Sequence, residues 1–224
     1  ENFAWRLSVT ADRLINWLCV GPWMFAPLEG ETRAAVMDTI GRQLRHLQFS
    51  GPEETDPVSR FRIAVALCLG GAVADDSHKI LEAGLAMLEA ECNAQILPDG
   101  GHASRSPEAL AEAMLDIQTV EELLLRLGLN APSFLTKLQT RMAAMLSFFQ
   151  QADGGILPAN GGGDSSNGIG RAAMRPHGAV NSKFSFARLS AYQRIQAEGL
   201  TVYVDAGAGP ERPNGAQAHA GALA

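Results

Sequence analysis

The stretch VSRFRIAVALCLGGAVA, residues 58–74, indicates the fold class more strongly than any other part of the sequence. Its side chains are apolar nearly all the way round a helix, which is typical of a helix in an inner layer. An acidic, proline-bearing loop, residues 50–57, leads into it. We therefore expect a mainly α-helical protein in which this segment lies inside.

Amphipathic patterns predict further helices on both sides of this segment. Val36, Ile40 and Leu44 recur at helical spacing before it, and residues 80–92 and 132–149 show the same period after it. Between them, Ser106 is a candidate N-cap, followed by a proline, for a helix that ends at Gly128. About six helices in succession predict an array of helical hairpins, either a toroid or a solenoid.

The composition changes after residue 151. The stretch ADGGILPANGGGDSSNGIG, residues 152–170, is rich in turn formers and poor in helix formers. SAYQRIQ (190–196) and LTVYVD (200–205) then have the composition of strands, and Gly199 between them suits a hairpin. Two strands and an unfinished third are marginal alone in water, so we expect the chain to be a fragment of a larger protein.

The bulk composition is that of a folded protein without an electrostatic signature for nucleic acid. The 224 residues are 46% hydrophobic and carry a net charge of −6. A net negative chain gives no support for non-specific nucleic-acid binding, and no apolar run approaches the length of a membrane span. Cys19, Cys68 and Cys92 are predicted to be buried hydrophobes. The compartment, periplasmic or cytoplasmic, and the oligomeric state stay open.

Four stretches, in order, resemble the heparinase II/III-like family of bacterial proteins. They are WRLSVTADRLINWL (5–18), QILPDGGHASRSPEAL (95–110), AAMLSFFQQADGGILPANGGG (143–163) and SAYQRIQAEGLTVYVDAG (190–207) followed by AHAGALA (218–224). The resemblance implies an incomplete α/α toroid of helical hairpins followed by the first strands of a truncated antiparallel β-sandwich. The expected domains are a helical domain over 1–151, a glycine-rich linker over 152–187 and the start of the sandwich over 188–224.

The same resemblance implies a polysaccharide lyase that acts by β-elimination on an acidic, uronate-containing polysaccharide. Such an enzyme must neutralise the uronate carboxylate, and it needs a base and an acid. We expect His102, Tyr192 and His219 to be catalytic and Asp99, Arg105 and Gln95 to bind substrate. The loop over residues 99–105, which holds Asp99, His102 and Arg105, precedes a helix N-terminus, which favours anions.

Departures from the family pattern weaken the prediction of catalysis and leave a second hypothesis open. Ser104 stands where lyases of this family carry a glutamate, and their His-x-His pair is Gln217-Ala218-His219 here. The alternative is therefore a non-catalytic glycan-binding or envelope-polysaccharide-handling protein. A helical array that binds a protein partner is a third hypothesis, but it needs neither the glycine-rich loop nor the strands. We expect no cofactor, and a metal in a missing part of the sandwich stays open.

Overall fold

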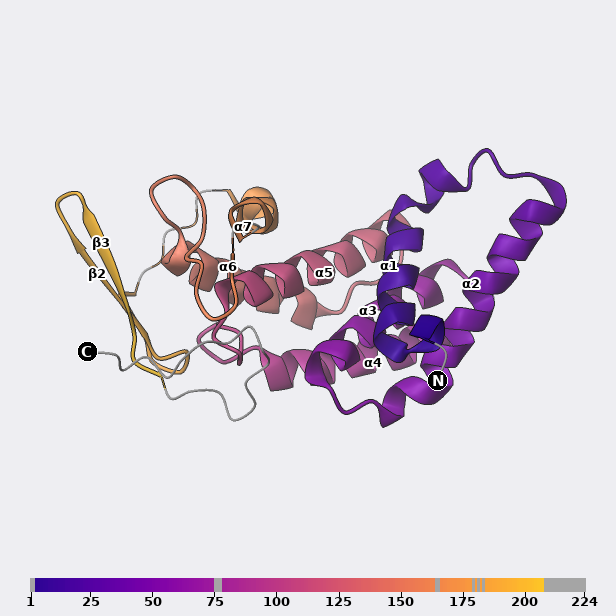
Figure 1. Ribbon diagram of the computed structural model, residues 1–224, viewed down its shortest axis with the longest axis horizontal. Coiled ribbons are helices and arrows are strands. Elements are labelled where there is room, and N and C mark those ends of the chain that lie inside the picture. The colour runs from indigo at the N-terminus through magenta and orange to yellow at the C-terminus, as the bar shows by residue number, and fades with distance from the viewer. Residues whose placement is uncertain are drawn as a thin grey trace. The chain divides into compact units, whose positions relative to one another are not determined.

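Helices make up most of the chain, as predicted (Figure 1). The structure is a computed structural model that describes residues 3–74, 78–163, 166–178, 180, 182 and 184–207. Its α-helices are α1 (Leu7–Met24), α2 (Gly30–Ser50), α3 (Pro57–Val73), α4 (His78–Gln95), α5 (Pro107–Arg126), α6 (Ser133–Phe149) and α7 (Ser166–Met174). Short 3-10 helices are η1 (Phe3–Trp5), η2 (Gly51–Glu53) and η3 (Arg175–His177), and the strands are β1 (Phe186–Ala187), β2 (Tyr192–Ala197) and β3 (Leu200–Asp205). The arrangement of the helices as a toroid is not confirmed.

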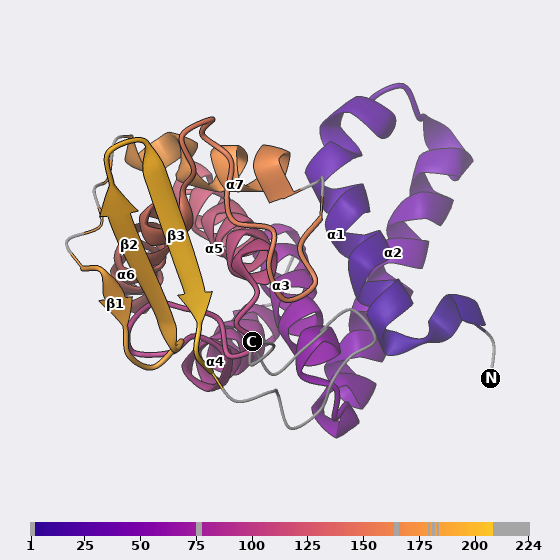
Figure 2. The same cartoon turned by 60° about the vertical axis from the view of Figure 1, so that its left-hand side comes forward.

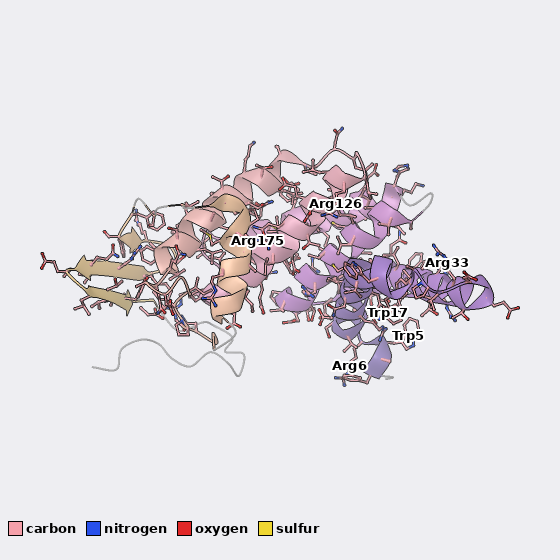
Figure 3. The ribbon with its side chains drawn as sticks, turned by 90° about the horizontal axis from the view of Figure 1, so that it is seen from above. Trp5, Arg6, Trp17, Arg33, Arg126 and Arg175 are labelled. Carbon is pink, nitrogen blue, oxygen red and sulfur yellow. The ribbon has the colours of Figure 1, made fainter. Side chains whose placement is uncertain are left out.

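The chain divides into two compact units. Unit 1 contains Glu1–Cys92 and Val120–Ala131, and unit 2 contains Asn93–Thr119 and Pro132–Ala224. This division differs from the predicted boundaries at residues 151/152 and 187/188, which stay predictions. All three tryptophans belong to unit 1, and Figure 3 labels two of them, Trp5 and Trp17.

Helix α3 is the buried centre of unit 1. Every side chain from Ile63 to Leu69 is at most 3% exposed, which confirms that the stretch is an inner helix. The helix begins at Pro57 because the Asp56 carboxylate accepts a hydrogen bond from the backbone N–H of Ser59 at 2.8 Å.

Two glycines let α3 and α4 approach each other closely. A Cβ atom at Gly71 would lie 2.5 Å from the backbone nitrogen of Leu81. One at Gly84 would lie 2.8 Å from the backbone nitrogen of Cys68. Neither backbone contact leaves room for a side chain, so glycine is required at this crossing.

The prediction for the cysteines is correct for two of the three. Cys68 and Cys92 are buried, and burial raises the pKa of the Cys92 thiol to about 12. Cys19 is exposed, so the prediction that it is buried is wrong. Its neighbour Val20 is also 47% exposed, because this side of α1 faces away from the α3 core.

The three strands of unit 2 form an antiparallel sheet in the order β1-β2-β3 (Figure 2). Gly199, at φ +71°, makes the tight turn between β2 and β3, as the sequence predicts. The sheet packs on the end of α6. There the ring of Tyr192 meets Phe149 edge-on at 5.0 Å, and Tyr203 meets Phe148 at 6.1 Å.

Helix α7 lies within the segment predicted to be a glycine-rich loop. A Cβ atom at Gly170 would lie 2.7 Å from Ile156 Cγ2, so this helix packs tightly on the chain before it. The Gln118 side-chain amide of α5 also donates to the carbonyl of Ala173 at 2.8 Å. Tertiary contacts therefore override the low helix propensity of the segment, and its description as loop throughout is wrong.

Candidate functional site

The loop between α4 and α5 holds three of the six predicted site residues: Asp99, His102 and Arg105. It closes as a tight turn, with an isolated antiparallel bridge between Ile96 and His102. Gly100, at φ +91°, packs so closely on α6 that a Cβ atom there would lie 2.3 Å from the carbonyl oxygen of Arg141. Only glycine fits this position, so the loop is held rigidly against its own unit.

Asp99 joins this loop to the turn that precedes β2. One carboxylate oxygen accepts the backbone N–H groups of Leu189 at 2.9 Å and Ser190 at 2.7 Å. The other accepts the hydroxyl of Ser190 at 2.9 Å and the N–H of Gly101 at 3.1 Å. Both oxygens are thus occupied by the protein, so Asp99 has a structural role here.

His102 is a neutral residue within the same loop. Its Nδ1 accepts the backbone N–H of Ser104 at 3.1 Å, which places the ring proton on Nε2. Burial lowers the pKa of His102 to about 4. An imidazole of such low basicity would be a weak general base at neutral pH.

Arg105 and Asp205 form an ion pair between the loop and the end of β3. Arg105 Nη1 donates to Asp205 Oδ1 at 2.5 Å, and the side chains are 8% and 23% exposed. The backbone of Gly207 lies so close to the Arg105 side chain that a Cβ atom at Gly207 would be 1.9 Å from Nη1 of Arg105. Arg105 itself has φ +60°, an uncommon conformation for a residue with a side chain. The pair is therefore part of a closely packed, locally constrained arrangement.

Asn160 and Tyr192 complete the network around this pair. Asn160 Nδ2 donates to the Tyr192 hydroxyl at 2.5 Å and to Asp205 Oδ2 at 3.0 Å. The Tyr192 hydroxyl in turn donates to the carbonyl of Arg105 at 3.0 Å. Three separate segments of unit 2, around residues 105, 160 and 192–205, are thereby connected through side chains.

Tyr192 is held protonated inside this network. It is 1% exposed, and burial, followed by the nearby Asp205 carboxylate, raises the pKa of its phenol. Its hydroxyl already donates to one group and accepts from another. A catalytic base would have to lose this proton, and the surroundings oppose that.

The remaining predicted site residues are Gln95 and His219. Gln95 is 6% exposed, and its backbone carbonyl accepts the N–H of Ala103 at 2.7 Å. His219 lies outside the described residues. The structure thus brings Arg105 and Tyr192 together in one network. Asp99 and His102 make their hydrogen bonds outside this network, with the turn before β2 and with Ser104.

Sequence reasoning missed three members of this arrangement: Asn160, Ser190 and Asp205. Each is separated by at least 32 residues from a partner that it contacts. No local pattern marks such partners. The one available signal was the residue type. Asn160 lies in a glycine-rich turn and Asp205 ends a strand, positions where short polar side chains commonly form hydrogen bonds.

The described part of the chain offers no group of three or more histidine, cysteine or acidic side chains placed to hold a metal ion. Among the helices of that part, none combines the length and the apolar character needed to cross a membrane. The Arg105 network is instead made of hydrogen bonds between protein side chains and backbone, which suits holding segments in place.

Comparison with known proteins gives one informative match. The chain is 28% identical over 215 residues to the FtsZ-localized protein C of Caulobacter vibrioides (strain NA1000 / CB15N), and the match covers 94% of this chain and 36% of that protein. The chain thus spans about a third of the length of this relative. No protein-family model matches the chain, and no solved structure matches it.

This match corrects the functional prediction from sequence. The relative is named for localisation with FtsZ, and neither it nor any family model supports the heparinase II/III-like family. The predictions of that family and of a polysaccharide lyase are therefore wrong, and the glycan-binding alternative has no support. They rested on four stretches that resemble the family in order. In one of these, residues 95–110, the structure explains the glycines and Asp99 by a tight turn and by hydrogen bonds of the Asp99 carboxylate.

Proposed function

We propose that this chain is part of a cell-division protein that localises with FtsZ. The single observation that carries the proposal is the match to FtsZ-localized protein C, which runs through 94% of the chain and so includes residues of both units. Because the chain spans only about a third of that relative, the proposal concerns the whole parent protein, to which these residues contribute.

The role we propose for residues 1–224 is binding or scaffolding. Support comes from the candidate site, where Asp99, Arg105 and Tyr192 each make hydrogen bonds within unit 2. His102 is neutral, and its Nδ1 atom accepts a hydrogen bond from the backbone N–H of Ser104. Groups held in this way are suited to fixing a surface, and catalytic roles for them stay predictions without a supported reaction.

Two further predictions belong to the proposal. Helical hairpins arranged as an incomplete toroid have the support of successive helices such as α1, α2 and α3, which contact one another within unit 1. The start of a β-sandwich has the support of the three antiparallel strands. Binding to an acidic polysaccharide also stays a prediction, and its only support was the family resemblance.

Fluorescence microscopy of the full-length parent, labelled at its own gene, tests the proposal. We expect a band that coincides with labelled FtsZ through the division cycle. A parent lacking residues 1–224 shows whether this part contributes, and we expect a weaker band at equal protein level. A uniform signal for the full-length protein would contradict the proposed function.

A further inference from the structure

The two faces of the β1-β2-β3 sheet differ sharply in character. Residues 192, 194, 203 and 205 lie on the face that packs on α6, and Tyr192 on this face is 1% exposed. Residues 193, 195, 202 and 204 alternate with them and lie on the opposite face. We call this opposite face the outer face.

The outer face is apolar and exposed. Its large apolar side chains, with their exposed fractions, are Phe186 (54%), Ile195 (49%), Leu200 (60%), Val202 (39%) and Val204 (40%). Ile195 pairs directly with Val202, and Gln193 lies between Val204 and Phe186. The side chains are therefore cross-strand neighbours that form one continuous surface.

This arrangement reverses what a sheet with one solvated face normally shows. Such sheets place apolar side chains toward the core and polar side chains toward water. Here the inner face carries Arg194 and Asp205, and the outer face carries no charge and, apart from Gln193, only apolar side chains. A sheet with apolar side chains on one face and the rings of Tyr192 and Tyr203 on the other is suited to burial on both faces.

We propose that the outer face is covered by an apolar layer from the same parent polypeptide, from a part outside residues 1–224. The match leaves 64% of the relative's length outside the shared region, so such polypeptide exists in that protein. In the described chain, β3 is an edge strand with a strand on one side only. An apolar, uncharged face fits a second apolar layer, packed about 10 Å away, better than a charged partner.

The size of the face favours an intramolecular layer over a second copy of the chain. Its five large side chains are far fewer than the roughly 20–30 residues per partner in a typical stable interface. A layer on the same polypeptide needs no such area, because its effective concentration is high. This inference is independent of the localisation with FtsZ.

Val202→Glu, made in both the full-length parent and the 224-residue chain, tests the proposal. In the parent we expect the variant to lower the Tm of the unit by about 5 °C or more, because it places a carboxylate in a buried apolar layer. In the 224-residue chain the same residue is exposed, so we expect a change within about 1 °C. Thr201→Glu, exposed on the opposite face of the same strand, is the control and should change neither protein.

Hydrogen exchange of residues 192–205 gives a local measurement of the same effect. We expect slower exchange in the parent than in the 224-residue chain, and Val202→Glu should remove the difference. Should that variant fail to fold in the parent, Val202→Thr, which keeps the shape, should show a smaller loss of protection. Equal exchange in the two wild-type proteins would overturn the proposal. A dimer of the 224-residue chain that Val202→Glu dissociates would also overturn it, because a second copy would then cover the face.

Discussion

Arg105 is the residue on which the candidate network depends. Its charge is buried and neutralised by Asp205, while its Nη2 atom has no hydrogen-bond partner in the described part of the chain. Removing the only neutralising carboxylate that contacts a buried guanidinium is costly, because the charge remains without compensation. The network therefore stabilises unit 2 through one pair of side chains that are 100 residues apart in the sequence.

Asp205→Asn should destabilise the protein by about 3 kcal/mol, since it leaves the Arg105 charge buried and unpaired. Far-UV circular dichroism during urea unfolding measures the change. The matched control is Asp38→Asn, which breaks the exposed pair between Asp38 and Arg42 in α2. We expect a change within about 0.5 kcal/mol there. Equal effects of the two substitutions would show that burial of the Arg105 pair does not matter.

The low pKa of His102 predicts a pH dependence of stability. Burial lowers its pKa in the folded protein from 6.5 to about 4, so the unfolded chain binds a proton at a higher pH than the folded protein. The free energy of unfolding should therefore fall as the pH decreases from about 6.5 to about 4. His102→Asn keeps an acceptor for the Ser104 N–H and should show a smaller fall over that range. Identical pH profiles would exclude this role for His102.

Single residues were predictable from sequence only where local chemistry decides them. Ser106 was expected to cap α5, and its hydroxyl accepts the N–H of Ala109 at 3.3 Å. Gly128 was expected to end this helix and has φ +69°. Asp205, which pairs with Arg105, and Ser190, which donates to Asp99, lie 100 and 91 residues away, and chain folding brings them together.

At the scale of elements, the crossing of α3 and α4 depends on glycine. Gly84→Ala places a methyl group 2.8 Å from the Cys68 backbone nitrogen, and we expect a loss of about 1–3 kcal/mol through overpacking. Tryptophan fluorescence measures the loss, because all three tryptophans lie in unit 1.

Gly41→Ala in α2 is the matched control for this prediction. Its Cβ atom would lie 3.5 Å from the end of the flexible Arg45 side chain, which can move. Alanine has the higher helix propensity, so we expect this substitution to stabilise the protein by up to about 1 kcal/mol. Stabilisation by both substitutions would contradict the close crossing.

Elements with a strong period were predicted well, and elements that depend on tertiary contact were not. The inner helix α3 and the hairpin β2–β3 were expected within a few residues of their observed bounds. Helix α7 was missed because its composition favours turns, and contacts such as that of Gly170 with Ile156 decide its structure. The outer face of the hairpin illustrates a different limit, since the sequence shows alternation without showing which face packs on α6.

At the scale of the whole molecule, the sequence predicted a mainly helical fold with a small sheet but led to the wrong function. Short turn motifs such as residues 97–105 serve folding in this protein. Function resides in sites and surfaces, so a likeness of such motifs to a family says little about chemistry. The match over 94% of the chain carries more information because it extends through both units.

Imaging the labelled full-length parent while FtsZ is depleted from the cells tests the central claim most directly. Localisation with FtsZ predicts that the band of the parent protein disperses as the FtsZ band disappears, with the total level of the parent unchanged. A band that persists after FtsZ has gone, or a parent protein that never forms one, would contradict the proposed function.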